Sequence, residues 1–248
     1  MRIITADTYE EMSKKAAAMV CSQVMLKPDC VLGLATGDTP LGMYKELIKM
    51  YENREVDFSD VTIFNLDEYC NLSRESPQSY HYYMHHNFFK HINIKKKNTH
   101  IPNGMAKDID EECRKYEQKI KNKGGIDLQV LGIGANGHIG FNEPDINFEA
   151  ETHLVELDEI TIEANSRFFS SRDDVPTTAI SMGIKTIMQS RKLLLLANGE
   201  AKAAAIYKTV KGKISPEVPS TIIQLHPDIT LIIEKSAAKL LSAGKHCK

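Results

Sequence analysis

The 248-residue chain has no tryptophan, no close pair of cysteines and a formal charge of only −2 at neutral pH. The near balance of charge gives no electrostatic argument for binding a nucleic acid or an anionic membrane. The odd number and wide spacing of the cysteines argue against a disulfide framework and against a zinc site. We therefore expect reduced thiols at all five positions, Cys21, Cys30, Cys70, Cys113 and Cys247.

The chain also lacks the basic, apolar and small-residue pattern of a secretory leader. No apolar run approaches the ~18 residues that a membrane-spanning helix needs. These two absences favour a cytoplasmic protein. A composition of 42% hydrophobic and 26% charged residues is typical of a globular chain, and a chain of this length can bury a sizeable core.

Short apolar segments alternate with segments of helical periodicity along most of the chain. The predicted strands are residues 2–5, 31–35, 61–64, 126–131, 193–197 and 230–233. The predicted helices are residues 8–26 (capped by Asp7), about 40–50, 79–91, 109–122, 199–210 and a short terminal one. Repeated strand–helix units predict a single α/β domain over residues 1–248, with a largely parallel sheet and helices on both faces. Residues 145–178 depart from the alternation and predict an inserted flap.

The sequence GIGANGHIGFNEP at residues 132–144, the catalytic loop below, follows the predicted strand 126–131. Its glycines allow tight turns and close approach of the backbone to a ligand. His138 can exchange protons near neutral pH, and Glu143 can fix its tautomer or share its proton. The pattern favours a catalytic loop at the carboxyl end of a strand; the alternative is a plain glycine-rich turn.

Ligands of open parallel sheets bind beyond the carboxyl ends of the strands, so the segments that follow other strands are also candidates. In TGDTP at residues 36–40, free N–H groups at a helix start suit a phosphate, and Thr36 and Thr39 add hydroxyl donors. A capped turn is the alternative, because Asp38 would repel an anion unless it points away. The segment is not a Walker loop, since G-x-x-x-x-G-K-[ST] is absent.

The adjacent acids Asp67 and Glu68 follow another apolar strand. They face opposite ways if the strand continues, so that one enters a cleft and the other meets solvent or a salt bridge. Asp67 beside a histidine loop predicts a general base, and a helix-capping pair is the alternative. Arg167 and Lys202 are candidates for phosphate oxygens, although each taken singly is more often a surface salt-bridge partner.

A histidine cluster suggests a metal site at first sight, since His81 and His85 would share one helix face with His86 beside them. No nearby Cys or Glu completes a ligand set with zinc spacing. We therefore expect no metal at this cluster.

Eight motifs along the chain carry a family resemblance: LGLATGDTP, FNLDEY, PQSYHYYMHHNFF, IPNGMAKDIDEECRKYE, GIGANGHIGFNEP, NSRFF, SMGIKTIM and QLHPD. The chain resembles the glucosamine-6-phosphate deaminases. The resemblance implies a Rossmann-like fold and, in the cytoplasm, conversion of D-glucosamine 6-phosphate and water into D-fructose 6-phosphate and ammonia, without a cofactor. The related 6-phosphogluconolactonases and a non-catalytic sugar-phosphate-binding regulator are the alternatives.

The same resemblance implies roles for individual residues. Asp67 would move the C2 proton, His138 would assist ring opening, Glu143 would be its carboxylate partner, and Asn136 would orient the group. The positions that match the family's phosphate-binding residues are Thr36, Gly37, Asp38, Thr39, Arg167 and Lys202.

Three departures from the family pattern bear on ligand binding. Asp38 stands where the family loop more usually has glycine. Residues 145–157 hold no Lys or Arg, whereas members activated by N-acetylglucosamine 6-phosphate carry basic residues there; His153 and Val155 occupy those places. The chain also ends soon after Ile233, without the long C-terminal segment of those members. We therefore expect no allosteric activation by that sugar phosphate.

Overall fold

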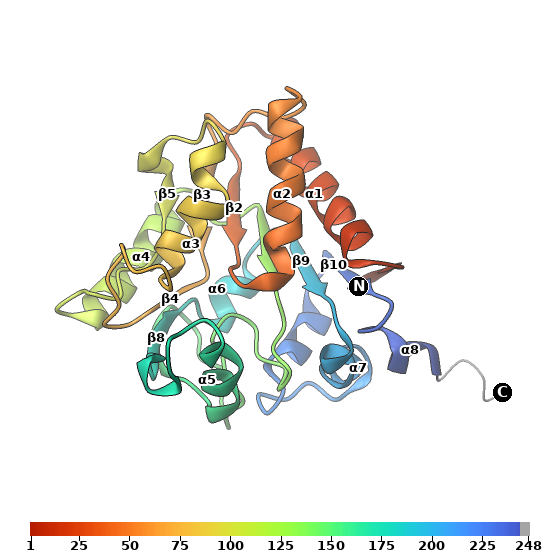
Figure 1. The fold of residues 1–248 in the computed structure, drawn as a ribbon. Helices are drawn as coiled ribbons and strands as arrows, with labels where there is room; N and C mark the ends of the chain where they lie inside the picture. The colour runs from red at the N-terminus through yellow and green to blue at the C-terminus, as the bar shows by residue number, and fades with distance from the viewer. Residues whose placement is uncertain (244–248) are drawn as a thin grey trace.

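The computed structural model describes residues 1–243 and shows a parallel seven-stranded sheet with helices on both faces (Figure 1). The strand order is β1-β10-β9-β6-β2-β3-β5, and every neighbouring pair is parallel. The strands are β1 (Arg2–Ala6), β2 (Val31–Leu34), β3 (Thr62–Asn65), β5 (Thr99–His100), β6 (Leu128–Leu131), β9 (Leu193–Ala197) and β10 (Ile229–Glu234). The predicted α/β architecture is confirmed.

Helices form an outer layer on each face of the sheet. One face is covered by α1 (Tyr9–Leu26), α2 (Asp38–Glu52) and α3 (Tyr80–Asn87). The other is covered by α4 (Ile109–Asn122), α6 (Ile184–Met188) and α7 (Ala203–Lys211), with α8 (Lys239–Ala243) at the end. Short 3₁₀ helices are η1 (Phe89–His91), η2 (Lys96–Asn98), η3 (Arg172–Asp174), η4 (Glu200–Lys202) and η5 (Pro219–Leu225).

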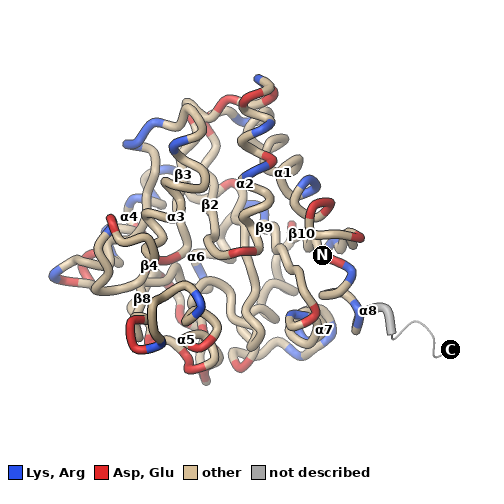
Figure 2. Tube along the Cα trace, in the orientation of Figure 1, with Lys and Arg blue, Asp and Glu red and all other residues tan. Residues whose placement is uncertain are grey.

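The two faces of the sheet explain why its inner strands are continuous apolar runs. Leu194 and Leu196 of β9 pack into the core under α1 and α2, while Leu193 and Leu195 pack into the opposite core. Successive side chains of a strand point to opposite faces, so a strand covered on both sides needs apolar residues at every position. Figure 2 shows Lys and Arg interspersed with Asp and Glu along the outer elements. A few acids, Asp67 and Glu68 among them, are buried.

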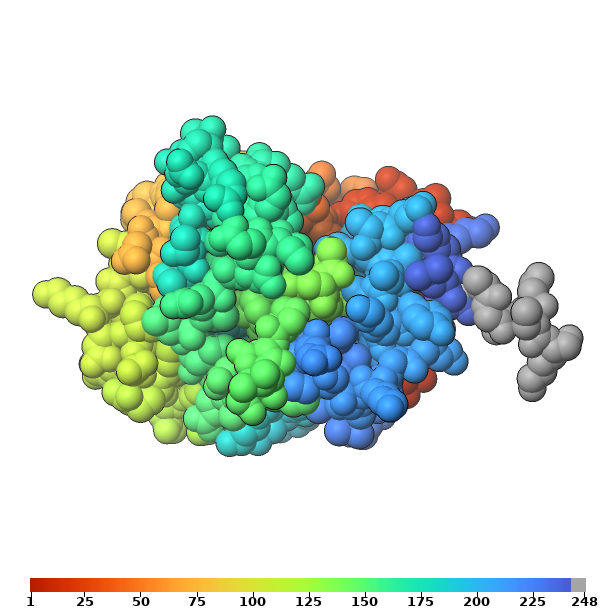
Figure 3. Space-filling model, turned by 90° about the horizontal axis from the view of Figure 1, so that it is seen from below, coloured from red at the N-terminus to blue at the C-terminus, as the bar shows by residue number. Residues whose placement is uncertain are grey.

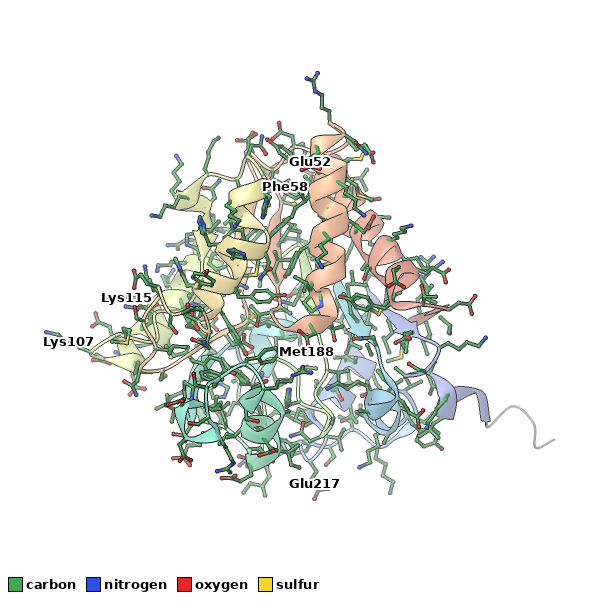
Figure 4. The ribbon with its side chains drawn as sticks, viewed as in Figure 1. Glu52, Phe58, Lys107, Lys115, Met188 and Glu217 are labelled. Atoms are coloured by element: carbon green, nitrogen blue, oxygen red, sulfur yellow. The ribbon has the colours of Figure 1, made fainter. Side chains whose placement is uncertain are left out.

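Aromatic rings pack at one end of the core that lies under α1 and α2. Phe58 meets Phe88 edge to face, with ring centroids 5.5 Å apart. Figure 4 shows Phe58 near the upper end of α2, where Glu52 ends that helix. This end of the molecule lies away from the carboxyl ends of the strands. Within residues 1–243, no helix is long and apolar enough to cross a membrane.

A second, three-stranded antiparallel sheet was not predicted. It contains β4 (Asp67–Tyr69), β8 (Thr178–Ser181) and β7 (His153–Glu156), in the order β4-β8-β7. Their sequences, DEY, TAIS and HLVE, show neither a continuous apolar run nor a full alternation, so periodicity does not mark them as strands. The predicted flap, residues 145–178, holds β7, η3 and one helix, α5 (Glu159–Ser166), and the pairing of β8 with β4 ties it to the main body.

Several predicted boundaries shift by local chemistry. The first helix is capped by Thr8 and not by Asp7, because the Thr8 hydroxyl accepts the Glu11 N–H. The predicted helix 79–91 ends at Asn87 and continues as η1, and the predicted helix 199–210 starts as η4. The predicted bounds 109–122 and 193–197 match α4 and β9.

Candidate active site

A cavity of about 220 Å³ opens at the carboxyl edge of the large sheet. Nine of the ten predicted site residues line it, and the tenth, Glu143, contacts it through His138. The lining comes from the segment after β2, the start of β4, the catalytic loop after β6, helix α5 of the flap, and η4. Segments far apart in the sequence therefore meet at one place, as the architecture predicted.

The cavity lies at the point where the order of strands along the sheet reverses. β2 and β6 are neighbours, but the chain runs from β2 to β3 on one side and from β6 to β9 on the other. Such a switch point leaves a crevice between the two outgoing connections, and ligands of open α/β sheets bind there. Figure 3, viewed from below Figure 1, shows green segments, which include the catalytic loop, in the middle of this face and teal segments of the flap toward its upper edge.

The catalytic loop holds its histidine by hydrogen bonds within the loop. His138 Nδ1 lies 3.1 Å from Glu143 Oε2, and Asn136 donates from Nδ2 to the same oxygen at 2.8 Å. The backbone N–H of His138 donates to Asn136 Oδ1 at 3.2 Å. Burial raises the pKa of the Glu143 carboxyl, but bonding to His138, with help from Thr161 and Asn136, outweighs burial and lowers it overall. Glu143 is thus an ionised partner that orients the imidazole.

Glycine is required in this loop for space. A Cβ added at Gly134 would lie 2.4 Å from His138 Cε1, so any side chain there would displace the ring. Gly140 has a φ of +58°, and a Cβ there would lie 3.7 Å from Asp67 Oδ2. The backbone of the catalytic loop therefore packs closely against its own His138 ring and passes near the Asp67 carboxyl of β4.

Asp67 occupies the inner part of the cavity and is only 6% exposed. Burial, and then the neighbouring charge of Glu68, raise the pKa of the Asp67 carboxyl to about 8. A carboxyl of this kind can both take and give a proton near neutral pH. The position and the pKa both suit an acid/base group.

Glu68 points the other way but meets neither solvent nor a salt bridge, so that prediction is wrong. Its side chain is buried, and Glu68 Oε1 accepts the N–H groups of Tyr69 and Tyr80 at 3.0 and 2.9 Å. Oε2 accepts the N–H of His81 at 2.9 Å. The carboxylate therefore caps the N-terminus of α3, where free backbone donors and the helix dipole favour negative charge. The capping alternative is correct for this one acid of the pair.

The other end of the cavity gathers groups that suit an anion. α2 begins here with Gly37 at its N-cap and no side-chain cap, which leaves backbone N–H groups at its first turn. Burial and then the charge of Arg167 lower the pKa of Lys202, so two cations from distant segments lie close together. Thr39 donates its hydroxyl to Asn198 Oδ1 at 2.7 Å. The two cations and the helix start form a candidate anion site, called the anion end below.

Asp38 does not point away from this anion end. Its Oδ2 accepts from Arg167 Nη2 at 2.7 Å, although both side chains remain more than half exposed, at 56% and 65%. The pair joins the first turn of α2 to the residue that ends α5. An anion that binds here must share Arg167 with Asp38 or displace the carboxylate from it.

Sequence reasoning missed several lining residues. Tyr80 stacks on Phe141 with centroids 5.9 Å apart, and both face the cavity. Thr161 and Asn165 line the cavity from α5. Their i, i+4 spacing just before Arg167 is a signal that would have placed them on one helix face.

The cysteines and histidines provide no further site. The four cysteines that the structure describes, Cys21, Cys30, Cys70 and Cys113, are free and buried, and Cys247 lies outside the described residues. Across residues 1–243, no group of three or more His, Cys, Asp or Glu side chains is placed to hold a metal ion.

Known proteins resemble this chain over nearly its whole length. The sequence profile of the family described as glucosamine-6-phosphate isomerases/6-phosphogluconolactonase matches residues 5–232. The chain is 65% identical to a glucosamine-6-phosphate deaminase of Clostridium botulinum, over 98% of this chain and 99% of that protein. It is 66% identical to a protein of the same name from Clostridium acetobutylicum, over 97% and 100% of the two chains.

Solved structures give the same result. A monomeric glucosamine-6-phosphate deaminase superposes with a TM-score of 0.95 at 48% identity, covering 97% of this chain and all of the other. A 6-phosphogluconolactonase from Thermotoga maritima shares the fold alone, with a TM-score of 0.75 at 19% identity over 94% and 99% of the chains. The chain therefore belongs to the glucosamine-6-phosphate isomerase/6-phosphogluconolactonase family.

Proposed function

We propose that this chain is an enzyme that converts D-glucosamine 6-phosphate and water into D-fructose 6-phosphate and ammonia. The observation that carries the proposal is one cavity that holds Asp67, with a pKa of about 8, and the His138–Glu143 pair. Relatives of 65% and 66% identity that bear the name glucosamine-6-phosphate deaminase support it.

Ring opening is assigned to His138. Glu143 bonds Nδ1, which leaves Nε2 for the substrate. Nε2 takes the proton of the C1 hydroxyl and returns a proton to the ring oxygen as the C1–O bond to the ring breaks. Asn136 and Glu143 hold the imidazole ring of His138 in place for this task and do not themselves exchange protons with the sugar.

Isomerisation is assigned to Asp67. The carboxylate removes the proton from C2 of the open-chain aldose and delivers one to C1 through an enol-type intermediate, which leaves an imine at C2. Water then adds to this imine, ammonia leaves, and C2 becomes the carbonyl carbon. Because the pKa of Asp67 is near 8, the ionised base becomes more abundant as the pH rises, and kcat/KM should increase up to about pH 8.

The substrate phosphate is assigned to the anion end. The first turn of α2, Arg167 and Lys202 would hold it at a distance from the reacting carbons. Binding energy gained there orients the sugar over Asp67 and His138. We take residues 1–248 as a single domain, within which residues 145–178 would act as a lid. The lid would close over the cavity and bring Arg167 to the phosphate. No metal or organic cofactor has a step in this scheme.

Activation by N-acetylglucosamine 6-phosphate is not part of the proposal. A second cavity, of about 530 Å³, lies beside the flap, and its lining includes the acids Asp145, Glu149, Glu156 and Asp158 but no Lys or Arg. Such a lining repels a phosphate at neutral pH. We also propose the cytoplasm as the place of action, because a charged sugar phosphate does not cross a bilayer unaided.

Ammonia release from glucosamine 6-phosphate by the purified chain, with metals chelated, tests the function. The parent should release ammonia steadily, and Asp67→Asn should lose about 10²–10⁴ in kcat because a placed base supplies that much. Asp60→Asn is the matched control, since this exposed acid pairs with Lys95 away from the cavity.

Each outcome has one meaning. Binding of glucosamine 6-phosphate without turnover by the folded parent would contradict the enzyme and indicate a sugar-phosphate-binding regulator. Hydrolysis of 6-phosphogluconolactone without ammonia release would indicate the lactonase branch of the family instead.

A further inference from the structure

The catalytic histidine has a contact from outside its own loop. Thr161, in α5 of the flap, is 3% exposed, and its Oγ1 lies 3.3 Å from His138 Nδ1. The other partners of His138, Asn136 and Glu143, belong to the catalytic loop itself. The His138 ring is therefore the place where the loop and the flap meet.

Proton accounting gives the direction of this contact. If Nε2 of His138 is to act as a base, Nδ1 must carry the proton and donate it to Glu143. The Thr161 hydroxyl then has no acceptor on the ring, so its own proton goes to the Glu143 carboxylate. This bond is among those that lower the pKa of Glu143. The hydroxyl oxygen of Thr161 stays in contact with His138 Nδ1 and limits how the imidazole ring can rotate.

The helix that carries Thr161 also reaches the anion end. Arg167 directly follows α5 as its C-cap and pairs with Asp38. Thr161 and Arg167 are six positions apart, about 9 Å along a helix. A shift of α5 that moves Arg167 onto a phosphate must therefore also move the Thr161 hydroxyl relative to His138.

We propose that Thr161 is a positioning residue that orients the His138–Glu143 pair from the flap and so makes histidine geometry depend on where α5 lies. This inference rests on the proposed function and adds a residue to it. Thr161 itself exchanges no proton with the substrate. Thr161 contributes the contact from the flap that holds the His138–Glu143 pair in its orientation.

Three variants of one helix test the role. Thr161→Val keeps the shape and removes the hydroxyl, and kcat should fall on the order of 10-fold, as is usual when a support of a catalytic group is lost. KM should stay within about twofold, because the phosphate groups are untouched. Thr161→Ser restores the hydroxyl and should recover most of kcat. Ser166→Ala removes another hydroxyl from α5, one that bonds the Glu163 carbonyl outside the cavity, and should match the parent.

A double-mutant cycle with Glu143→Gln separates positioning from loss of structure. If Thr161 acts through Glu143, adding Thr161→Val to Glu143→Gln should cost far less than Thr161→Val alone. Additive losses, an unchanged kcat in Thr161→Val, or no rescue by Ser would each overturn the inference.

A measurement that needs no catalysis separates the test of the Thr161 contact from the test of the proposed function. Nitrogen-15 NMR of the ligand-free protein should show altered His138 ring signals in Thr161→Val and unaltered ones in Ser166→Ala. Identical spectra in all three proteins would overturn the contact whatever the parent's activity. Absence of ammonia release by the parent would instead overturn the proposed function.

Discussion

The two ends of the cavity are built in opposite ways. At the proton-transfer end, His138, Asn136 and Glu143 come from one loop of 13 residues and are bonded to one another. At the anion end, Arg167 and Asp38 come from segments 129 residues apart and remain more than half exposed. The first end is organised in the ligand-free protein, whereas an anion at the second end would have to share Arg167 with Asp38 or displace the carboxylate from it. Chemistry needs fixed geometry, and capture of a charged group tolerates movement.

Of the changes that test this comparison, the largest effect is expected at the organised end. Glu143→Gln keeps an acceptor for Nδ1 but removes the charge that stabilises protonated His138, so kcat should fall about 10–100-fold with little change in KM. Glu149→Gln, an exposed acid at the base of the flap, is the matched control in steady-state kinetics. A Glu143→Gln enzyme with the parent's kcat would mean that this end is not organised by its carboxylate.

Next in size is the loss of the flap's cation. Arg167→Ala removes a charge-assisted donor from the proposed phosphate site, and KM should rise about 10-fold while kcat changes less. Arg172→Ala, which breaks ion pairs with Glu159 and Glu163 elsewhere in the flap, controls for flap stability. An unchanged KM in Arg167→Ala would show that this residue does not bind the phosphate.

A smaller effect of opposite sign is expected at Asp38. Asp38→Asn releases Arg167 from an exposed ion pair, and such pairs are weak, so KM should fall about two- to fivefold. Raising the salt concentration should lower the advantage, because salt screens the Asp38 charge in the parent. A higher KM in Asp38→Asn would mean that the carboxylate holds Arg167 in a productive position.

The last effect is on stability and is measured on a different scale from the kinetic ones. The folded chain keeps a proton on Asp67 up to about pH 8, whereas the unfolded chain loses it near the ordinary value of 3.8. The folded state therefore binds more protons in this window, and stability falls as the pH rises through it. Asp67→Asn does not titrate, so its melting temperature should gain on the parent's by a growing margin between pH 5 and pH 8. Asp60→Asn should run parallel to the parent, and parallel curves for Asp67→Asn would contradict the raised pKa.

The same contrast explains how far the sequence could be interpreted. The order of strands and helices followed from local periodicity, and α4 and β9 were bounded correctly because their apolar patterns are strong. The catalytic loop was recognisable because its residues are close in sequence. The strands β4, β7 and β8 escaped prediction because their three or four residues form no continuous apolar run, and β4 pairs with β8 across more than 100 positions.

Side-chain direction was harder to predict than position. Asp67 and Glu68 were correctly placed on opposite faces, but only packing against α3 shows that Glu68 caps that helix from the inside. The spacing of Thr161, Asn165 and Arg167 could have placed Thr161 on the helix face toward the cavity, but nothing in the local sequence shows that it contacts His138. Its contact with His138 depends on how the flap is anchored by β8.

The sequence by itself determined the α/β class, the catalytic loop and the chemical types of the groups that follow each strand, because these depend on neighbours within a few residues. Tertiary structure alone decided that Asp38 turns toward Arg167, that burial raises the pKa of Asp67, and that Thr161 reaches His138. Each of these depends on desolvation or on contact between distant segments. Such effects arise only when the sheet brings the carboxyl ends of its strands together.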